Sequence, residues 1–447
     1  MNGFHSVTID RTRCKGCINC MKRCPTEAIR VREGKATIIS ERCVDCGECI
    51  RICLNRAKKS VYDDFSMLEN YKWKVAMTAP SFYGQFGGID DINIILTALK
   101  KIGFDSVFEV SCAAELVSHL TRRNFDRIRS SCTGPVISSA CSAVVRLIRV
   151  RYPALCGNVL PVNEPFHLAA QMAREEAMTE TGLDPSEIGI FFISPCPAKV
   201  TSAKAPIGIE RSFVTGVFSA SDIYIRLQSV IKKIGVPEQL MRSGIVGINW
   251  ATSGGEAAGL MTDNYLTADG MENVVNVLEE IEDGKLNDID FVELNACPGG
   301  CVGGVLNVAN PFVTRSRIKT LRKYLPVTKN KLDGGDNSHM FWEKVLQYEA
   351  VFKLDDDLFE AMNKMKMISE IEGRLPGLDC GSCGAPSCRA LAEDVVRGTA
   401  RESDCVVKFR DQLEQLSRIG VDLSSVLPAP FRHSADSKTE ERKDEKL

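Results

Sequence analysis

Long apolar runs are missing from this sequence, since none reaches the roughly 18 residues that a membrane-spanning helix needs. The first ten residues, MNGFHSVTID, also lack the apolar stretch of a secretory signal peptide. No dinucleotide fingerprint, flavin motif, kinase segment or PAS-like segment is recognisable, so a nicotinamide cofactor would require a partner protein. We therefore expect a cytoplasmic protein with no membrane association.

An excess of charge of one sign is absent too, because the net charge is -2 and provides no overall field to select a partner. Residues 1–60 are locally basic, with 13 Lys and Arg against 6 Asp and Glu. Aromatic residues do not alternate with these basic residues, so we expect no nucleic-acid binding. The local excess indicates either a surface that attracts an acidic redox partner or a solvated face around anionic clusters.

Cysteine, by contrast, is abundant, with 19 in a chain of 447 residues. A secreted disulfide scaffold would be short and would carry a signal peptide, so reduced thiolates that bind metal account better for this number. Sixteen of the cysteines fall into groups with metal-ligand spacing. Cys112, Cys132 and Cys156 remain, and we predict that they are small apolar residues of the core.

Residues 1–60 contain two runs of four cysteines with the spacing C-x2-C-x2-C-x3-C. This is the pattern of bacterial two-cluster ferredoxins, in which the fourth cysteine of a run binds the other cluster. The spacing fits zinc poorly, because zinc sites prefer two C-x2-C pairs at a longer separation. We predict one [4Fe–4S] cluster on Cys14, Cys17, Cys20 and Cys53, and a second on Cys43, Cys46, Cys49 and Cys24. Between the runs, residues 26–40 predict a short helix and a hairpin with Gly34 at its turn.

From about residue 74 to 325, short apolar runs alternate with amphipathic helical patterns. The runs that predict strands are residues 73–81, 106–111, 188–195, 243–250 and 289–296. The segments that predict helices are residues 90–103, 142–153, 220–235 and 271–284. The alternation predicts an α/β domain with parallel sheets flanked by helices, in which sites gather at the carboxyl ends of the strands.

Three segments of this region carry cysteines directly after apolar runs: SSACSAVV, ISPCPAK and ELNACPGGCVGG. Together they resemble the three signatures of the [FeFe]-hydrogenase catalytic domain, over roughly residues 75–325. The resemblance implies a two-lobed domain that binds an H-cluster, which is a [4Fe–4S] cube joined by one cysteine sulfur to a two-iron site with carbonyl, cyanide and bridging azadithiolate ligands. The cysteines that the resemblance assigns to the cube are Cys141, Cys196, Cys297 and Cys301, with Cys301 as the bridge.

The same resemblance implies roles for residues beside the cysteines. Lys199 matches the family lysine that donates a hydrogen bond to a cyanide, and we count it with Cys301 as catalytic. Pro80, Ser81 and Pro195 match residues that line the two-iron site.

Departures from the family pattern are equally informative. Ala140 stands where a cysteine normally passes the last proton, and an alanine cannot relay a proton. Ser194 and Asn295 replace two methionines beside the cluster, which changes the hydrogen bonding around it. The residues after the first ligand are Ser142-Ala143-Val144 instead of Pro-Gly-Trp. This pattern is similar to the divergent [FeFe]-hydrogenases proposed to sense H2.

Another proton route is then needed, and Glu256 in TSGGEAAG is the first candidate for it, as a catalytic acid–base group. Glu115 and Glu293 are weaker candidates. The alternative for Glu256 is that its carboxylate simply provides a favourable charge in the first turn of a helix.

A third cysteine group lies near the end of the sequence, in LPGLDCGSCGAPSC and beyond it. It resembles the small iron–sulfur domain found in the B component of the Rnf complex and in corrinoid iron–sulfur proteins, which implies an α-rich unit with one [4Fe–4S] cluster. Zinc is the alternative, but no histidine lies within the group. The predicted ligands of this third cluster outside the active site are Cys380, Cys383, Cys388 and Cys405.

The expected organisation follows from these motifs and from composition. The parts are a ferredoxin-like domain (1–60), a connector (61–73), the H-cluster domain (74–325), a helical linker (326–370), a C-terminal [4Fe–4S] domain (371–420) and a mostly disordered tail (421–447).

The sequence thus predicts an enzyme for H2 = 2 H+ + 2 e−, slow in turnover and acting as an H2 sensor. The alternatives are a ferredoxin-coupled metabolic hydrogenase and a non-enzymatic iron–sulfur electron-transfer or assembly scaffold. The expected partners are H2 and protons, a ferredoxin or another redox or signalling protein, and the maturation proteins that insert the two-iron unit.

Overall fold

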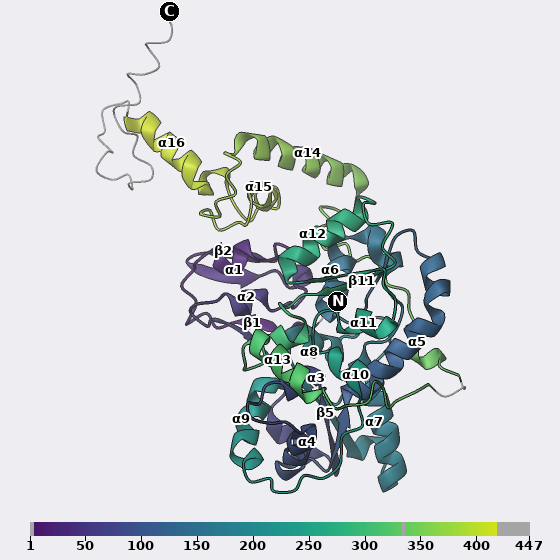
Figure 1. The fold of residues 1–447 in the computed structure, drawn as a ribbon. Coiled ribbons are helices and arrows are strands. Elements are labelled where there is room, and N and C mark those ends of the chain that lie inside the picture. The colour runs from purple at the N-terminus through teal and green to yellow at the C-terminus, as the bar shows by residue number, and fades with distance from the viewer. Residues whose placement is uncertain (1–3, 333–335, 418–447) are drawn as a thin grey trace, which may run out of the picture. The chain divides into compact units, whose positions relative to one another are not determined.

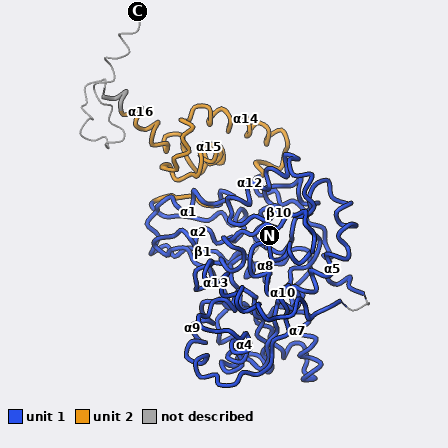
Figure 2. Tube along the Cα trace, viewed as in Figure 1, with its two compact units in different colours: residues 1–28, 34–352 blue, residues 29–33, 353–447 orange. Residues whose placement is uncertain are grey.

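The computed structural model describes residues 4–332 and 336–417, which form two compact units (Figure 2). Unit 1 consists of residues 1–28 and 34–352, and unit 2 consists of residues 29–33 and 353–447. Strand β2 (Ile29–Arg32) therefore belongs to unit 2, although the chain on both sides of it belongs to unit 1. The tail predicted to be disordered, residues 421–447, lies outside the described residues.

Unit 1 contains two parallel sheets, which confirms the predicted fold class (Figure 1). The four-stranded sheet has the order β6-β5-β8-β9, with β5 (Trp73–Thr78), β6 (Ser106–Glu109), β8 (Ile188–Ser194) and β9 (Gly216–Ser219). The three-stranded sheet has the order β10-β11-β7, with β7 (Val136–Ile137), β10 (Tyr265–Asp269) and β11 (Phe291–Asn295). All of these strand pairs are parallel.

Helices cover both faces of the four-stranded sheet. All seven residues of β8 are buried, and successive side chains enter different cores: Ile190 and Phe192 join one core, whereas Phe191 and Ile193 join the other. This is the alternation expected of a strand that is buried on both faces. The first core includes side chains of α5 (Val110–Ser130) and α7 (Pro165–Thr181), and the second includes side chains of α4 (Ile92–Lys101) and α9 (Ala220–Ile231).

A third core joins the smaller sheet to α6 (Ser142–Arg151) and α12 (Met271–Glu282). The remaining α-helices of this region are α3 (Pro80–Tyr83), α8 (Pro197–Lys204), α10 (Ile245–Asn249), α11 (Gly255–Leu260) and α13 (Pro311–Leu321). Within the described ranges, no helix combines the length and the apolar character needed to span a membrane.

One strand prediction in this region was wrong, because residues 243–250 contain helix α10. A short apolar run does not distinguish a strand from a buried helix, and here tertiary packing selects the helix. Helix α10 lies directly on α5, and a Cβ at Gly247 would come within 2.1 Å of the carbonyl oxygen of Ser111. The contact is with backbone, which cannot move aside as a flexible side chain can.

We therefore expect Gly247→Ala to destabilise unit 1 by about 1 to 3 kcal/mol or more, as overpacking in a core does. Thermal unfolding of the purified protein measures the loss. Gly235→Ala is a matched control, because no atom lies within 4 Å of a Cβ built there. Equal melting temperatures for the two variants would contradict the close approach of α10 to α5.

The cysteine-rich N-terminal segment has short elements around its two cysteine runs. Strands β1 (Val7–Ile9) and β4 (Lys58–Ser60) pair antiparallel, and β3 (Lys35–Ile38) follows the predicted turn at Gly34. Helices α1 (Asn19–Lys22) and α2 (Glu48–Arg51) each precede the fourth cysteine of a run. The short helix predicted after Cys24 is absent from the described structure, because this segment bends around the sulfur and Ala28 donates its amide to Cys24 Sγ at 3.2 Å.

Unit 2 is mainly helical apart from β2. Its helices are α14 (Leu358–Arg374), α15 (Cys388–Val396) and α16 (Val406–Ser417). A small apolar core includes Ile368 and Ile371 of α14, Leu391 of α15 and the buried Cys405.

Candidate metal centres

Four cysteines from distant segments line one cavity in unit 1. Cys141 and Cys196 are the residues before α6 and α8, and Cys297 and Cys301 follow β11. Burial raises the pKa of the Cys301 thiol to about 12, and the neighbouring thiolates of Cys196 and Cys141 add to the shift. Metal binding would replace these protons, since the thiolate is the ligand form of cysteine.

The loop that carries Cys297 and Cys301 is fixed to the turn before α11. Ser253 donates its amide to the carbonyl of Gly299 at 3.0 Å, and Val302 donates to the carbonyl of Ala251 at 2.9 Å. These bonds bring Glu256, the second residue of α11, into the neighbourhood of the cysteine loop.

Lys199 lines the same cavity and is held by two hydrogen bonds. Its Nζ donates to the carbonyl of Ala140 at 3.0 Å and to Glu164 Oε2 at 2.8 Å. Burial lowers the pKa of Lys199, but Glu164 and the nearby thiolates outweigh burial and raise it overall. Lys199 is therefore a charged ammonium. Its third N–H has no hydrogen-bond acceptor among the described residues, and Nζ lies 4.9 Å from the centroid of the Phe166 ring.

Glu164 was missed by the sequence analysis, although it organises the surroundings of Lys199. Its carboxylate also accepts hydrogen bonds from Ser142 Oγ at 2.6 Å and Ser202 Oγ at 2.9 Å. Burial raises its pKa, but Lys199 and the other donors outweigh burial and lower it. Little in the sequence marks Glu164, since it is a single acidic residue directly before Pro165, the first residue of α7.

In the N-terminal segment the structure brings together the sulfurs that the ferredoxin spacing predicts. Burial raises the pKa of Cys20, and the thiolates that raise it further are Cys17, Cys53 and Cys14. Burial likewise raises the pKa of Cys43, and the thiolates that add to this are Cys24 and Cys46. Each group thus takes its fourth sulfur from the other run, and backbone amides of Ala28 and Ala57 donate to Cys24 and Cys53. That the groups hold clusters stays a prediction.

Cys46 of the second group also lines the cavity of Cys141, Cys196, Cys297 and Cys301. A second contact joins the N-terminal segment to the loop after Cys301, because Arg51 donates to the carbonyl of Gly303 at 2.7 Å. The second N-terminal group is therefore adjacent to the central cavity, which the sequence did not predict.

The C-terminal cysteines gather within unit 2. Cys383, Cys388 and Cys405 contact one apolar core, and Cys388 begins α15. Burial raises the pKa of Cys383, and the thiolates of Cys405 and Cys380 raise it further. The four predicted ligands are thus close together.

Comparison with known families matches the central region. The family described as iron only hydrogenase large subunit, C-terminal domain, matches residues 72–210 and 216–305, which is more than half of the chain. The chain belongs to this hydrogenase family. A 4Fe-4S dicluster domain matches residues 6–54, and an iron–sulfur (FeS) family matches residues 375–407.

Matches to individual relatives have low sequence identity or cover only a short segment. Iron hydrogenase 1 of Clostridium pasteurianum is 25% identical over 420 residues, which cover 78% of this chain and 73% of that protein. The B component of the ion-translocating oxidoreductase complex of Methanosarcina acetivorans is 50% identical over 44 residues, only 10% of this chain and 17% of that protein. A variant of the [FeFe]-hydrogenase HydA1 from Chlamydomonas reinhardtii superposes with a TM-score of 0.47 at 14% identity, covering 64% of this chain and 98% of that one.

Of the residues matched to the two-iron site, Pro80, Ser81 and Pro195 do not line the cavity, although α3 contacts the turn Cys301–Gly303. Pro80 and Ser81 begin α3, at the carboxyl end of β5, and β5 is paired with β8, which leads to Pro195 and Cys196. Ser81 is fully buried, and its hydroxyl has no hydrogen-bond partner in the described structure. A buried, unpaired hydroxyl is costly unless a ligand accepts a hydrogen bond from it. The Ser81 hydroxyl and the third N–H of Lys199 are donors suited to carbonyl or cyanide ligands.

The side chains that depart from the family pattern bond to protein groups near the cavity. Ser194 Oγ donates to the carbonyl of Cys196 at 2.9 Å, and Asn295 Nδ2 donates to Glu293 Oε1 at 2.8 Å. Ser194 and Asn295 therefore bear on the metal site through the ligand backbone and through a neighbouring carboxylate.

Glu256 lies beside this arrangement. It is buried and accepts a hydrogen bond from Ser138 Oγ at 2.5 Å, and Ser138 Oγ accepts from the amide of Ala140 at 3.1 Å. Burial raises the pKa of Glu256 to about 8, and the charge of Glu293 adds to the shift. Burial therefore favours the protonated form of Glu256, which is the form that a proton donor needs.

The two weaker candidates are bound by protein groups. Glu293 accepts the amides of Gly254 and Ala257, both at 2.9 Å. Glu115 accepts from Thr328 and from the amides of Lys329 and Asn330, so it fixes that loop.

The three cysteines outside the groups differ in burial. Cys112 is 1% exposed and belongs to the first core, where its thiol lies 3.4 Å from Ser243 Oγ. Cys132 and Cys156 are only partly buried.

Proposed function

We propose that this protein catalyses H2 = 2 H+ + 2 e− slowly and serves as an H2 sensor. The observation that carries this proposal is the cavity lined by Cys141, Cys196, Cys297 and Cys301 together with Lys199. The bound H-cluster would supply the chemistry of H2 cleavage and formation, and maturation proteins would have to insert its two-iron unit.

The chain's own residues account for the supporting roles. The four cysteines would hold the cube, with the Cys301 sulfur shared with the two-iron unit. Lys199, fixed by Glu164 and Ala140, would direct its remaining N–H at a cyanide. The buried walls exclude water, which strengthens that hydrogen bond.

Electrons would enter through the N-terminal clusters. Cys46 lines the central cavity, so the cluster predicted on Cys43, Cys46, Cys49 and Cys24 would be next to the cube. An acidic electron carrier such as a ferredoxin would suit the excess of Lys and Arg in residues 1–60.

Protons would pass through Glu256 and Ser138. The route then meets Ala140, which offers no side-chain proton, so the final transfer would need a water molecule or a longer step. A slow final transfer favours sensing over metabolic turnover. The C-terminal cluster adds a redox group that a signalling partner could read.

Infrared spectroscopy after maturation with a synthetic two-iron cofactor tests the proposal. We expect cyanide and carbonyl bands that shift reversibly between H2 and inert gas, together with weak H2 evolution. Fast evolution would favour the ferredoxin-coupled metabolic hydrogenase. Absence of the bands in a protein with its other clusters intact would leave an electron-transfer or assembly scaffold.

A further inference from the structure

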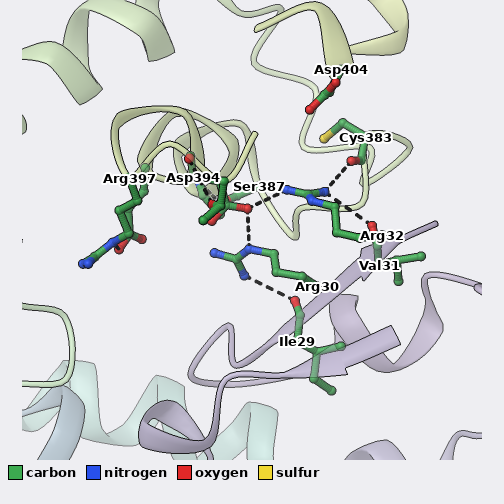
Figure 3. Close-up of polar contacts among 12 residues, drawn as sticks. Ile29, Arg30, Val31, Arg32, Cys383, Ser387, Asp394, Arg397 and Asp404 are labelled. Carbon is green, nitrogen blue, oxygen red and sulfur yellow. Dashed lines mark hydrogen bonds and ion pairs between the residues drawn. The ribbon is translucent and has the colours of Figure 1, made fainter. Parts of the chain in front are cut away.

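Strand β2 contacts the C-terminal cysteine domain through two arginines that share one carboxylate (Figure 3). Arg30 Nε and Arg32 each donate to Asp394 Oδ2 at 2.7 Å. The side chains of Arg30 and Asp394 are 6% and 8% exposed, so this ion pair is buried. Asp394 lies on α15, the helix that begins at Cys388.

The backbone of β2 makes a second contact, with the loop that carries Cys383. The amide of Val31 donates to the carbonyl of Gly384 at 2.9 Å, and Arg32 donates to the carbonyl of Cys383 itself at 2.7 Å. Gly384 has φ of +79°, and a Cβ there would lie 1.9 Å from the carbonyl oxygen of Val31. The strand and the cysteine loop are therefore in direct backbone contact.

The contact places a positive charge beside a predicted metal ligand. The guanidinium groups of Arg30 and Arg32 both pair with the single carboxylate of Asp394. Arg32 bonds the Cys383 carbonyl at 2.7 Å, so its guanidinium charge lies beside that predicted ligand and would stabilise negative charge there.

We propose that β2 is a docking strand whose attachment to the Cys383 loop tightens when the C-terminal [4Fe–4S] cluster is reduced. Reduction adds one electron, and hence one negative charge, to the cluster and its four thiolates. Arg32 stabilises that added charge when β2 is docked. Linkage is reciprocal, so the reduced cluster must in turn favour the docked strand.

The strand is well placed to transmit such a change, because Arg30 follows the predicted cluster ligand Cys24 by only six residues. The redox state of the C-terminal cluster would thus act on the chain next to an N-terminal cluster. This inference requires the C-terminal cluster but does not depend on hydrogenase activity.

Hydrogen exchange at the Val31 amide reports docking directly, because that amide bonds across to Gly384. We expect exchange in the full-length, cluster-reconstituted protein to be about tenfold slower after dithionite reduction than in the oxidised state. In a redox titration, the change in exchange rate should occur at the same potential as the electron paramagnetic resonance signal of the C-terminal cluster. That signal is the one that Cys380→Ser alters. Equal exchange in both states, or a change that follows another cluster, would overturn the proposal.

Arg32→Gln provides a second readout. If the docked strand binds the reduced state tenfold more tightly than the oxidised state, the difference corresponds to about 59 mV for one electron. Arg32→Gln should therefore lower the midpoint potential of the C-terminal cluster by about that amount. Arg397→Gln is the matched control, since Arg397 lies next to α15 but pairs with Glu393 and the carbonyl of Lys353. The same potential in both variants would contradict the role of Arg32. If Arg32→Gln does not fold, the exchange measurement on the unaltered protein still tests the proposal.

Discussion

Replacing Lys199 by methionine is expected to destabilise unit 1 by about 3 to 5 kcal/mol, the usual effect of removing one partner of a buried ion pair. The variant leaves Glu164 buried without its counter-ion, since the two side chains are only 12% and 9% exposed. Chemical denaturation of the protein with its iron–sulfur clusters, but without a two-iron unit, measures the loss. A loss of stability in this form of the protein does not depend on hydrogenase activity.

The loss of stability in Lys199→Met should be larger at neutral pH than at acid pH. With Lys199 present the pKa of Glu164 is lowered, so this carboxylate contributes stability above its unfolded value of 4.5 and loses it as pH falls through the folded value. Without Lys199, burial raises the pKa, and stability falls as pH rises above 4.5. The difference between the two proteins should therefore widen from acid to neutral pH.

Two further variants separate the structural effect from the cofactor effect. Lys204→Met on the same helix removes a more exposed pair with Asp63 and should cost only about 0 to 1 kcal/mol. Adding Glu164→Gln to Lys199→Met should recover most of the stability, yet the cyanide bands should remain shifted or absent after maturation. An effect of Lys199→Met no larger than that of Lys204→Met would contradict the buried pair.

Replacing Glu256 by glutamine should reduce H2 evolution about 10²- to 10⁴-fold, the range that general acid–base groups contribute. In the unaltered protein, evolution should decline as pH rises through about 8, because Glu256 then loses the proton that it donates. The glutamine variant should lack this dependence. Rates measured from pH 6 to 9 on the matured enzyme test both expectations.

The competing interpretation is that Glu256 only provides a favourable first-turn charge in α11. Glu272→Gln is a suitable control, because Glu272 is an exposed acid in the first turn of α12. If Glu256→Gln alters stability but leaves the rate and the pH profile like those of the Glu272 variant, Glu256 is not on the proton route.

The sequence predicted what depends on local spacing and periodicity. Repeated cysteine spacings indicated the sulfurs that lie together near Cys20 and Cys43, because cluster binding restricts such spacings closely. The alternation of apolar runs and helices indicated the parallel sheets, since the periods 2 and 3.6 are set by backbone geometry. The short run at residues 243–250 was misassigned because neither period is decisive over eight residues.

Long-range packing decided the rest. No local signal shows that Glu164 pairs with Lys199, that Cys46 reaches the central cavity, or that β2 belongs with residues 353–417. Each depends on where distant segments meet, and a buried charge or thiol acquires its properties from those neighbours. The sequence by itself therefore determined the family and the groups of sulfurs, and the tertiary structure decided which charges surround them.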